Sequence, residues 1–187
     1  MRTMGLFGIA VLVAGCSGAR SGLFPLEVGN TWSYSVRGGF VTRVVDLKVL
    51  SIESVAGVRG FKLDGPMGSS RIAWNQGILV AEELAGSRFS PPVQLLDSNQ
   101  PAQHLLWNGL VSAMGRTSNA IAVVTQSNES FEIAGRKYPA VVSTVELQTA
   151  GRSMELKTWY VDGIGPVRQE QRNNGTLYPS AIYLSGP

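Results

Sequence analysis

The sequence predicts a mainly β fold: a single curved antiparallel sheet, in the form of a half-barrel or barrel-like meander, with at most one or two short helices. Three observations predict it. Glycine supplies 22 of the 187 residues and charged residues only 16%, a composition that favours short strands and tight turns over helices. Turn-forming residues recur about every ten residues beyond residue 22. Apolar and polar residues alternate with a period of two in several segments, as they do in strands.

The first segment of the chain is expected to lie outside the fold. Residues 1–15 combine a basic residue, Arg2, with a short apolar run that ends at Cys16, which is the pattern of a secretory signal peptide. The run is shorter than the ~20 apolar residues that a membrane-spanning helix needs. Residues 16–22 are small and mostly polar and are predicted to form a tether. Residues 23–187 are predicted to form one antiparallel β domain, since no linker or internal repeat divides them.

Three segments beyond the tether carry the clearest strand pattern. Each places apolar side chains on one face and polar ones on the other, which is typical of a sheet with one buried face. The segments are 43–52, 141–148 and 154–161. Their apolar faces are Val45, Leu47 and Val49 in the first, Val141, Val145 and Leu147 in the second, and Met154, Leu156 and Tyr160 in the third.

The remaining elements follow from turn chemistry. Segment 71–84 is predicted to be a β-hairpin with its turn at 75–77. The best helix candidate is 101–110, where Pro101 suits a first helical turn and Asn108 with Gly109 could end the helix. Gly, Pro, Asn and Asp predict the turns between strands. These turns lie at 38–39, 57–60, 65–66, 75–77, 86, 91–92, 108–109, 127–128, 135, 151, 162–163 and 173–175.

The residues around Cys16 resemble the lipobox of bacterial lipoproteins. Val13, Ala14 and Gly15 then match the signal-peptidase recognition site, and Cys16 matches the cysteine that receives diacylglyceryl and acyl (palmitoyl) chains. The resemblance implies that residues 1–15 are removed and that the lipid on Cys16 anchors the chain in a membrane. Ser17, not an aspartate, follows the cysteine, which in this family favours the outer membrane facing the periplasm over the inner membrane. The alternative is an ordinary secretory signal in which Cys16 is incidental.

Three segments of the mature chain resemble a family of secreted bacterial domains, many of them lipoproteins. The opening segment is similar to a PLxxGNxWxY motif and the closing one to a WYxxGxGxV motif, whereas the middle match, 91–96 followed by a tryptophan, is weaker. The resemblance implies a curved antiparallel sheet like that of periplasmic lipoprotein carriers, and it brings no catalytic residue. Pro166 departs from the apolar residue usual in the closing motif. The matching residues are Pro25, Leu26, Gly29, Asn30, Trp32 and Tyr34, and Trp159, Tyr160, Gly163, Gly165 and Val167.

Polar residues that could carry chemistry lack partners in the sequence. The only histidine, His104, lies beside two leucines, and the only cysteine is Cys16, so a His- or Cys-based metal site is not expected. Glu82 and Glu83 fit a solvated strand end better than an acid–base pair, and Asp97 has no evident nucleophile to assist. Asp64 and Asp162 each precede glycine, as turn residues do. We therefore predict no catalytic residue, no metal and no cofactor.

The aromatic residues offer the best candidate binding face. Trp32 and Trp159 are assigned to the core because both belong to the motifs above. Trp74 and Trp107 fit a core position and a binding groove equally well. The candidate face for an apolar ligand consists of Trp74, Ile78, Leu105, Leu106 and Trp107.

Together these features predict a membrane-anchored, non-catalytic lipoprotein of the cell envelope. Its concave sheet face would bind an apolar or amphiphilic ligand or a partner lipoprotein. The alternative is a structural or assembly accessory of an envelope complex that binds no small molecule. The expected partners are the membrane, reached through the anchor, a lipid or hydrophobic ligand, and another envelope protein. Nucleic acid is not expected, because the basic residues are scattered along the chain.

Overall fold

Short turns that end in glycine join many of the strands. At 56–57, 76–77, 85–86, 114–115, 134–135 and 174–175, both turn residues have a positive φ. This is the conformation of two-residue hairpin turns, whose twist matches that of the strands they join. The structure is a computed structural model that describes residues 22–187, and within this range the hairpins follow one another without a helix.

Twelve strands lie between Thr31 and Ser185 in the described chain, and each pairs with its neighbours in sequence. Their bounds are β1 Thr31–Gly38, β2 Val41–Val55, β3 Val58–Asp64, β4 Ser70–Asn75, β5 Ile78–Leu84, β6 Ser87–Asp97, β7 Gln103–Ala113, β8 Arg116–Ile133, β9 Arg136–Thr149, β10 Arg152–Val161, β11 Gly165–Asn173 and β12 Thr176–Ser185.

The first and last strands close the sheet into a barrel. β1 pairs with β2 on one side and with β12 on the other, so that Tyr34 lies opposite both Val45 and Tyr183. All of the pairings are antiparallel. The predicted mainly β, barrel-like meander is therefore confirmed, and the described residues form a fully closed barrel.

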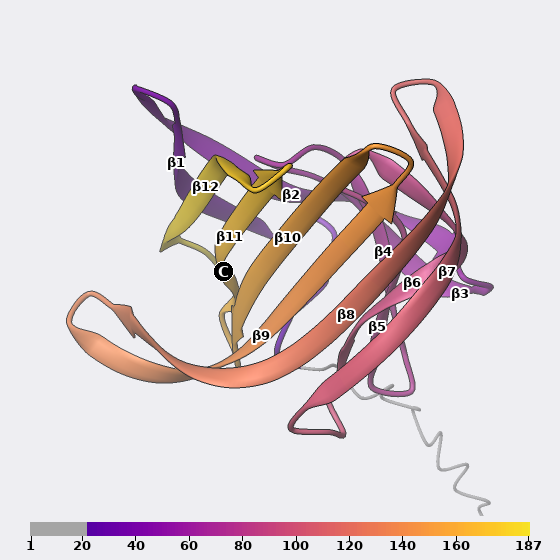
Figure 1. Ribbon diagram of the computed structural model, residues 1–187. Coiled ribbons are helices and arrows are strands. Elements are labelled where there is room, and N and C mark those ends of the chain that lie inside the picture. The colour runs from indigo at the N-terminus through magenta and orange to yellow at the C-terminus, as the bar shows by residue number, and fades with distance from the viewer. Residues whose placement is uncertain (1–21) are drawn as a thin grey trace, which may run out of the picture.

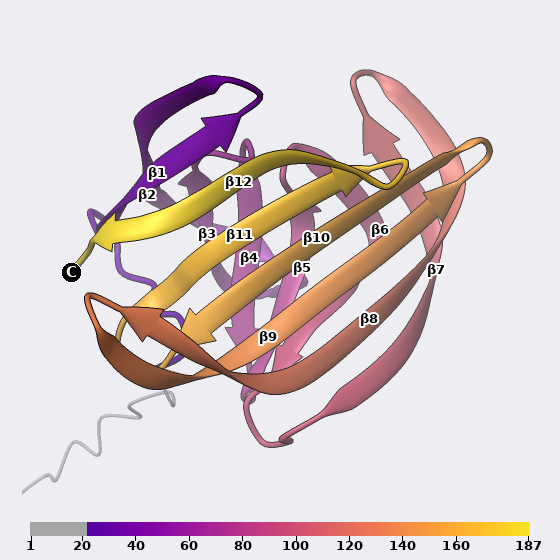
Figure 2. The ribbon, with the colours of Figure 1, turned by 60° about the vertical axis from the view of Figure 1, so that its left-hand side comes forward.

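The barrel has two broad walls. β8 to β12 form one wall and β2 to β7 lie behind it (Figures 1 and 2). The β8–β9 hairpin is longer than the strands beside it, and its tip projects beyond the wall and curls (Figure 2). Along most of these strands, every second side chain points into the barrel, and these inward-facing side chains are mostly apolar. The interior cluster includes Trp32, Tyr34, Leu63, Leu79, Leu96, Val124 and Leu156.

The strands predicted from alternation are confirmed. Segment 43–52 lies in β2, where Leu47 and Val49 are buried and Lys48 is exposed. Segments 141–148 and 154–161 lie in β9 and β10. The predicted hairpin at 71–84 is formed by β4 and β5.

The helix predicted at 101–110 is wrong, because most of this segment belongs to β7. Its residues alternate between a buried and an exposed face, with Trp107 and Val111 buried and Leu106 exposed. That period of two governs the backbone, whereas Pro101 precedes the strand and begins no helix. The turns predicted at 91–92, 108–109 and 127–128 are wrong for a similar reason, since they lie inside β6, β7 and β8.

The ladder between β6 and β7 is short. It contains only the pairs Arg88–Ser112, Phe89–Val111 and Ser90–Leu110. Pro91 and Pro92 follow in β6 and have no N–H to donate, so they cannot continue the ladder. The rest of β6 is mostly buried and remains paired with β5.

The second half of β6 approaches the opposite wall. Ser143 on β9 donates its hydroxyl to the carbonyl of Leu95 at 2.8 Å. The side chain of Gln126 on β8 accepts from the backbone N–H of Asp97 and donates to its carbonyl. The two walls are thus joined through the interior by hydrogen bonds to the backbone of β6.

Among the described residues, no helix has the length and apolar character needed to cross a membrane.

Candidate functional site

The opening and closing motifs of the sequence meet at one end of the barrel. Trp32 donates its indole N–H to the carbonyl of Ile164 at 2.6 Å, and the Tyr34 hydroxyl donates to the carbonyl of Pro166 at 2.6 Å. Gly165 lies between these two carbonyls with φ at +101°, and a Cβ there would lie 2.9 Å from the indole nitrogen of Trp32. The motif residues therefore hold the turn between β10 and β11 against β1.

The segment before β1 packs across this same end. Phe24 is buried, with its ring 5.3 Å from that of Trp32 and 5.9 Å from that of Tyr160. The indole N–H of Trp74 donates to the carbonyl of Phe24 at 3.1 Å. Leu26 is also buried. We call this the sealed end and define it by residues 22–30 together with the β10–β11 turn at 162–164.

Two further bonds fix the segment in place. Asn30 donates from its side-chain amide to the carbonyl of Pro25 at 2.9 Å, while Gly29 at φ +95° allows the turn into β1. At the start of the described chain, the backbone N–H of Gly163 donates to the carbonyl of Gly22 at 2.8 Å. The chain therefore enters the barrel beside the β10–β11 turn.

Burial shifts the tyrosines of this region toward their neutral form. The pKa of Tyr34 is well above its usual value, chiefly because burial penalises the phenolate, with further repulsion from Tyr160 and Tyr183. Burial likewise raises the pKa of Tyr160. Both hydroxyls therefore keep their protons at neutral pH, and Tyr34 acts as a hydrogen-bond donor.

A second apolar cluster lies on the outside of the barrel, where the curled β8–β9 hairpin covers β10 and β11. Its buried members alternate along the strands with residues of the interior, so they face outward. Partly buried residues from the hairpin and from β12 pack against them. We call this the outer cluster: Ala140, Val142, Trp159, Val161 and Val167, with Phe131, Ile133, Tyr138, Ile164 and Tyr183 around them.

A carboxylate on β8 holds Trp159 in the outer cluster. Glu129 accepts from the Trp159 indole N–H at 2.8 Å and from the Lys157 ammonium at 3.0 Å. Lys157 and Arg168 also lie over the Trp159 ring, 4.6 and 4.9 Å from its centroid. The hydrogen bond from Trp159 is the main reason that the pKa of Glu129 is lowered. Sequence inspection did not single out Glu129, and no motif links it to a tryptophan thirty residues away.

The residues of the candidate ligand face do not share one surface. Trp74, Leu105 and Trp107 pack against the interior cluster, and Trp107 also donates its indole N–H to the carbonyl of Pro91 at 3.0 Å. Ile78 is half-buried at the start of β5. Leu106 points to the opposite face of β7 and is 75% exposed. The indole N–H groups of Trp74 and Trp107 are thus bonded to backbone carbonyls of this chain.

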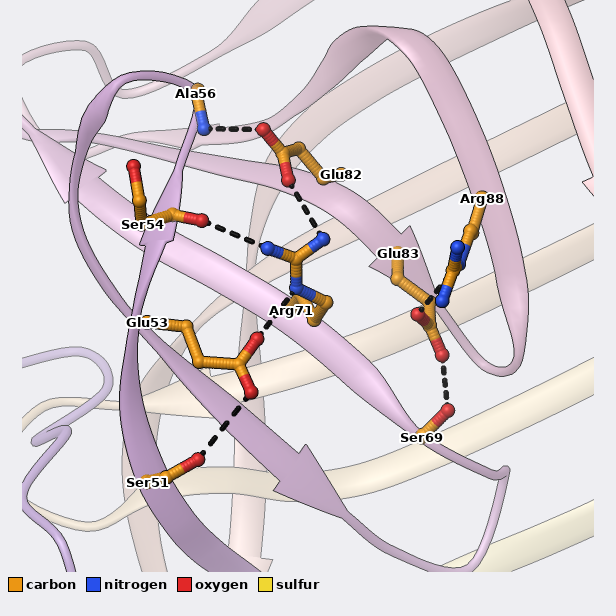
Figure 3. A network of polar contacts seen from close by, with 9 residues as sticks. All are labelled: Ser51, Glu53, Ser54, Ala56, Ser69, Arg71, Glu82, Glu83 and Arg88. Carbon is orange, nitrogen blue, oxygen red and sulfur yellow. Dashed lines mark hydrogen bonds and ion pairs between the residues drawn. The ribbon is translucent and has the colours of Figure 1, made fainter.

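Charged residues gather instead on the outside of β2 to β5 (Figure 3). Arg71 contacts Glu53 at 2.8 Å and Glu82 at 3.0 Å, and it donates to the carbonyl of Ser54 at 2.8 Å. Glu82 also accepts from the backbone N–H of Ala56 at 2.7 Å, at the tip of the β2–β3 hairpin. Figure 3 shows the guanidinium of Arg71 between the two carboxylates. This arrangement fastens the hairpin to β4 and β5.

The other polar candidates are also accounted for by structural contacts or exposure. Glu83 is buried beside the Ser69 hydroxyl and the Arg88 guanidinium. Asp97 is buried and accepts from the backbone N–H of Asn99. His104 is exposed on β7. Within residues 22–187, no three His, Cys, Asp or Glu side chains come together in a way that could hold a metal ion.

One shallow cavity lies near the opposite end of the barrel from residues 22–30. It has a volume of about 220 Å³ and is bordered by charged and polar residues of β9, β10 and β11 together with Leu147 and Met154. Arg172 and Glu155, which border it, form an ion pair at 3.4 Å. The lining of the cavity is thus a mixture of polar and apolar side chains, whereas small-molecule sites are mostly apolar.

The comparisons with known proteins concern the fold. No protein-family model matches the chain, and no curated protein matches it. A candidate lipoprotein from Parabacteroides distasonis has a similar structure, with a TM-score of 0.53 at 12% identity over 89% of this chain and 99% of that one.

Two other solved structures are less similar. A candidate exported protein with a YmcC-like fold from Bacteroides fragilis has a TM-score of 0.48 at 13% identity, covering 88% of this chain and 98% of its own. The hypothetical lipoprotein YmcC from Escherichia coli has a TM-score of 0.42 at 15% identity, covering 83% and 84%. The Parabacteroides structure shows that this barrel fold occurs in another bacterial protein.

Proposed function

We propose that this chain is a non-catalytic lipoprotein of the cell envelope whose barrel serves as an accessory that docks on another envelope protein. The lipobox-like residues before Cys16, which lie outside the described residues, carry the anchor part of the proposal. The similar fold of a candidate lipoprotein from Parabacteroides distasonis supports it.

The entry point of the chain supports an orientation for the anchored barrel. Gly22 is bonded to Gly163 at the sealed end, and it is the sixth residue after Cys16. Six residues span at most about 21 Å. The sealed end therefore faces the membrane at short range, and the opposite end, with the turns at 39–40 and 114–115, faces away from it.

The packed interior favours an accessory over a carrier. The inward-facing apolar side chains of the barrel contact one another in one continuous cluster, which includes Trp32 and Leu156. The segment with Phe24 covers one end of that cluster. An apolar ligand would have to displace side chains that already fill the space, and close-packed interiors resist such displacement.

Two measurements test the proposal. With Cys16→Ser, the protein should move from the membrane fraction to the soluble periplasmic fraction. If it stays on the membrane, the anchor is wrong. Native mass spectrometry of the released chain should show the mass of the polypeptide alone, whereas a co-purifying lipid would support the carrier alternative.

A further inference from the structure

The departure of β6 from β7 leaves part of β7 without a main-chain partner. β7 pairs with β8 over its whole length, Gln103–Ala113, but with β6 only at 110–112. Residues 103–109 therefore have a ladder on one side only. Unpaired strand edges are places where another extended chain can add to a sheet.

The turn after β7 determines which backbone groups face that open side. Ala113 and Arg116 flank the two-residue turn at 114–115, so they form a hydrogen-bonded pair. Every second residue back from Ala113 bonds to β8, and the residues between direct their N–H and C=O the other way. The pairs of Ser112 and Leu110 with β6 agree with this pattern. The open edge consists of the main-chain groups of His104, Leu106 and Asn108.

The inner side of this edge is closed by side chains. Gln103 bonds to the side chain of Gln94 at 2.7 Å, and Trp107 donates to the carbonyl of Pro91 at 3.0 Å. Gly109 lies where β6 turns away, and a Cβ there would come within 2.6 Å of the Trp107 ring. Side chains therefore span the gap between β6 and β7 on the side that faces the barrel interior. A partner strand would have to approach the edge of β7 from outside the barrel.

The outer face beside the edge is apolar. Leu106 is 75% exposed, and Ile121 and Leu110 on the same face are 51% and 45% exposed. Asn108 pairs with Ile121 across the β7–β8 ladder, which places Ile121 next to the edge. An added strand with apolar residues at alternate positions would cover these side chains while its backbone pairs with β7.

We propose that the edge of β7 at residues 104–108 is a docking site for an extended segment of a partner protein, which adds to the sheet as a further strand. Only an extended polypeptide presents acceptors and donors at the spacing of alternate residues in a strand. The choice of a foreign segment rests on the proposed anchor. An antiparallel pair of two copies through this edge would turn their sealed ends in opposite directions, so both could not be tethered to one membrane.

A pair of proline variants tests whether the edge is free. Proline is tolerated where the N–H of an edge strand faces solvent, but not where it belongs to a ladder. In the chain carrying Cys16→Ser, Leu106→Pro should leave the thermal unfolding midpoint within a few degrees of the parent. The neighbouring Leu105→Pro removes a bond to β8 and should lower it by much more. Equal losses for the two variants would show that the edge is paired, and the proposal would fail.

A displayed library of random seven-residue peptides tests docking itself. Peptides selected on the Cys16→Ser chain should bind Leu106→Pro about tenfold more weakly, because one backbone donor is lost. Ile182→Ala, which removes a 47% exposed side chain from β12, a strand paired on both sides and far from β7 in the barrel, should change binding by less than about threefold. N-methylation of alternate amides in a selected peptide should abolish binding.

Three results of the binding experiment would also overturn the proposal: no peptide that prefers the parent over Leu106→Pro, a peptide unaffected by N-methylation, or self-association of the parent that Leu106→Pro abolishes. The last result would assign the edge to a second copy of the chain. None of them bears on the membrane anchor, because the experiment uses the released chain. A failure of the docking proposal can therefore be distinguished from a failure of the anchor proposal, which would show as retention of the Cys16→Ser protein on the membrane.

Discussion

At the scale of single residues, the sealed end depends on hydrogen bonds from buried aromatic side chains to carbonyls 132 positions away. Tyr34 is wholly buried, and its hydroxyl is within 2.6 Å of the Pro166 carbonyl. A buried carbonyl that loses its donor costs about 1–3 kcal/mol. These bonds explain why aromatic residues with a polar atom, and not phenylalanine, occupy positions 32 and 34.

Tyr34→Phe tests that explanation. The change keeps the ring and leaves the Pro166 carbonyl unpaired, so the free energy of unfolding in urea should fall by about 1–3 kcal/mol. Tyr183→Phe is the matched control, because Tyr183 is half-buried and makes an edge contact with Tyr34 through its ring. Its loss should stay below about 0.5 kcal/mol. Similar losses for both variants would mean that the hydroxyl bond of Tyr34 contributes little.

The ion pair at Glu129 should make the outer cluster sensitive to acid. Its pKa is lowered in the folded state, first by the Trp159 hydrogen bond and then by Lys157 and Arg168. A lowered folded pKa contributes stability that is present above the ordinary value of about 4.3 and is lost as the pH falls through the folded value. Glu129→Gln should therefore lower the unfolding temperature at pH 7, and the difference should vanish near pH 3. A difference that persists at pH 3 would contradict this assignment.

The sequence identifies residues that are important for the structure more readily than it identifies the residues that they contact. The motif resemblance singled out Trp32, Tyr34 and Gly165, which meet at the sealed end. Nothing in their spacing shows that Trp32 lies against Gly165. Glu129 was missed because its partner, Trp159, is two strands away across β9, and a single sequence carries no signal for that distance.

At the scale of elements, the β10–β11 turn contains two glycines that are needed for different reasons. Gly165 has a positive φ and lies against the Trp32 indole, whereas Gly163 has a positive φ and open space around its Cα. Gly163→Ala should therefore cost about 1 kcal/mol for backbone strain alone. Gly165→Ala adds the displacement of a buried tryptophan and should cost at least about 2 kcal/mol. Equal costs, measured by urea unfolding, would contradict the close approach.

The β2–β3 hairpin should loosen when Arg71 is replaced. Arg71→Met keeps much of the side-chain volume but removes two ion pairs and the bond to the Ser54 carbonyl (Figure 3). We expect a loss of about 1–2 kcal/mol and faster hydrogen exchange in residues 50–60. Arg88→Met is the control, since Arg88 is largely exposed and has one acidic partner. Unchanged exchange at 50–60 in Arg71→Met would show that apolar packing holds the hairpin.

The error at β7 shows where local sequence signals mislead. Pro101, Asn108 and Gly109 resemble the start and end of a helix, yet Gly109 lies inside a strand. Its missing side chain makes room for the Trp107 ring and the backbone of β6. A glycine that permits such a close approach cannot be distinguished in the sequence from one that ends an element, because its neighbours in space belong to another strand.

At the scale of the whole molecule, composition and turn spacing were enough to predict an antiparallel meander. The closure of that meander was not determined by any local pattern. It requires β1 to pair with β12, about 150 residues later, and the register comes from side chains that interlock only in the finished barrel. The same holds for the packed interior, since alternation shows which residues face inward but not whether they fill the space.

Phe24 offers a test of how that interior is closed. Its ring is 4% exposed and packs on Trp32 and Tyr160 over the end of the barrel. Phe24→Ala should cost about 3–5 kcal/mol, which corresponds to a fall of roughly 6–20 °C in the unfolding temperature of a domain of this size. Val28→Ala in the same segment changes a side chain that is 53% exposed and should shift it by about 2 °C or less.

The same variant separates a filled barrel from a carrier. If the ring of Phe24 completes a packed interior, the parent chain should bind little of the apolar dye ANS, and Phe24→Ala should bind more because a cavity opens beside Trp32. A carrier would behave differently. Its interior would already accept the dye in the parent, and removing Phe24 would widen an existing opening with little loss of stability. Strong binding by the parent together with a small change in unfolding temperature would therefore favour a ligand-binding barrel over a docking accessory.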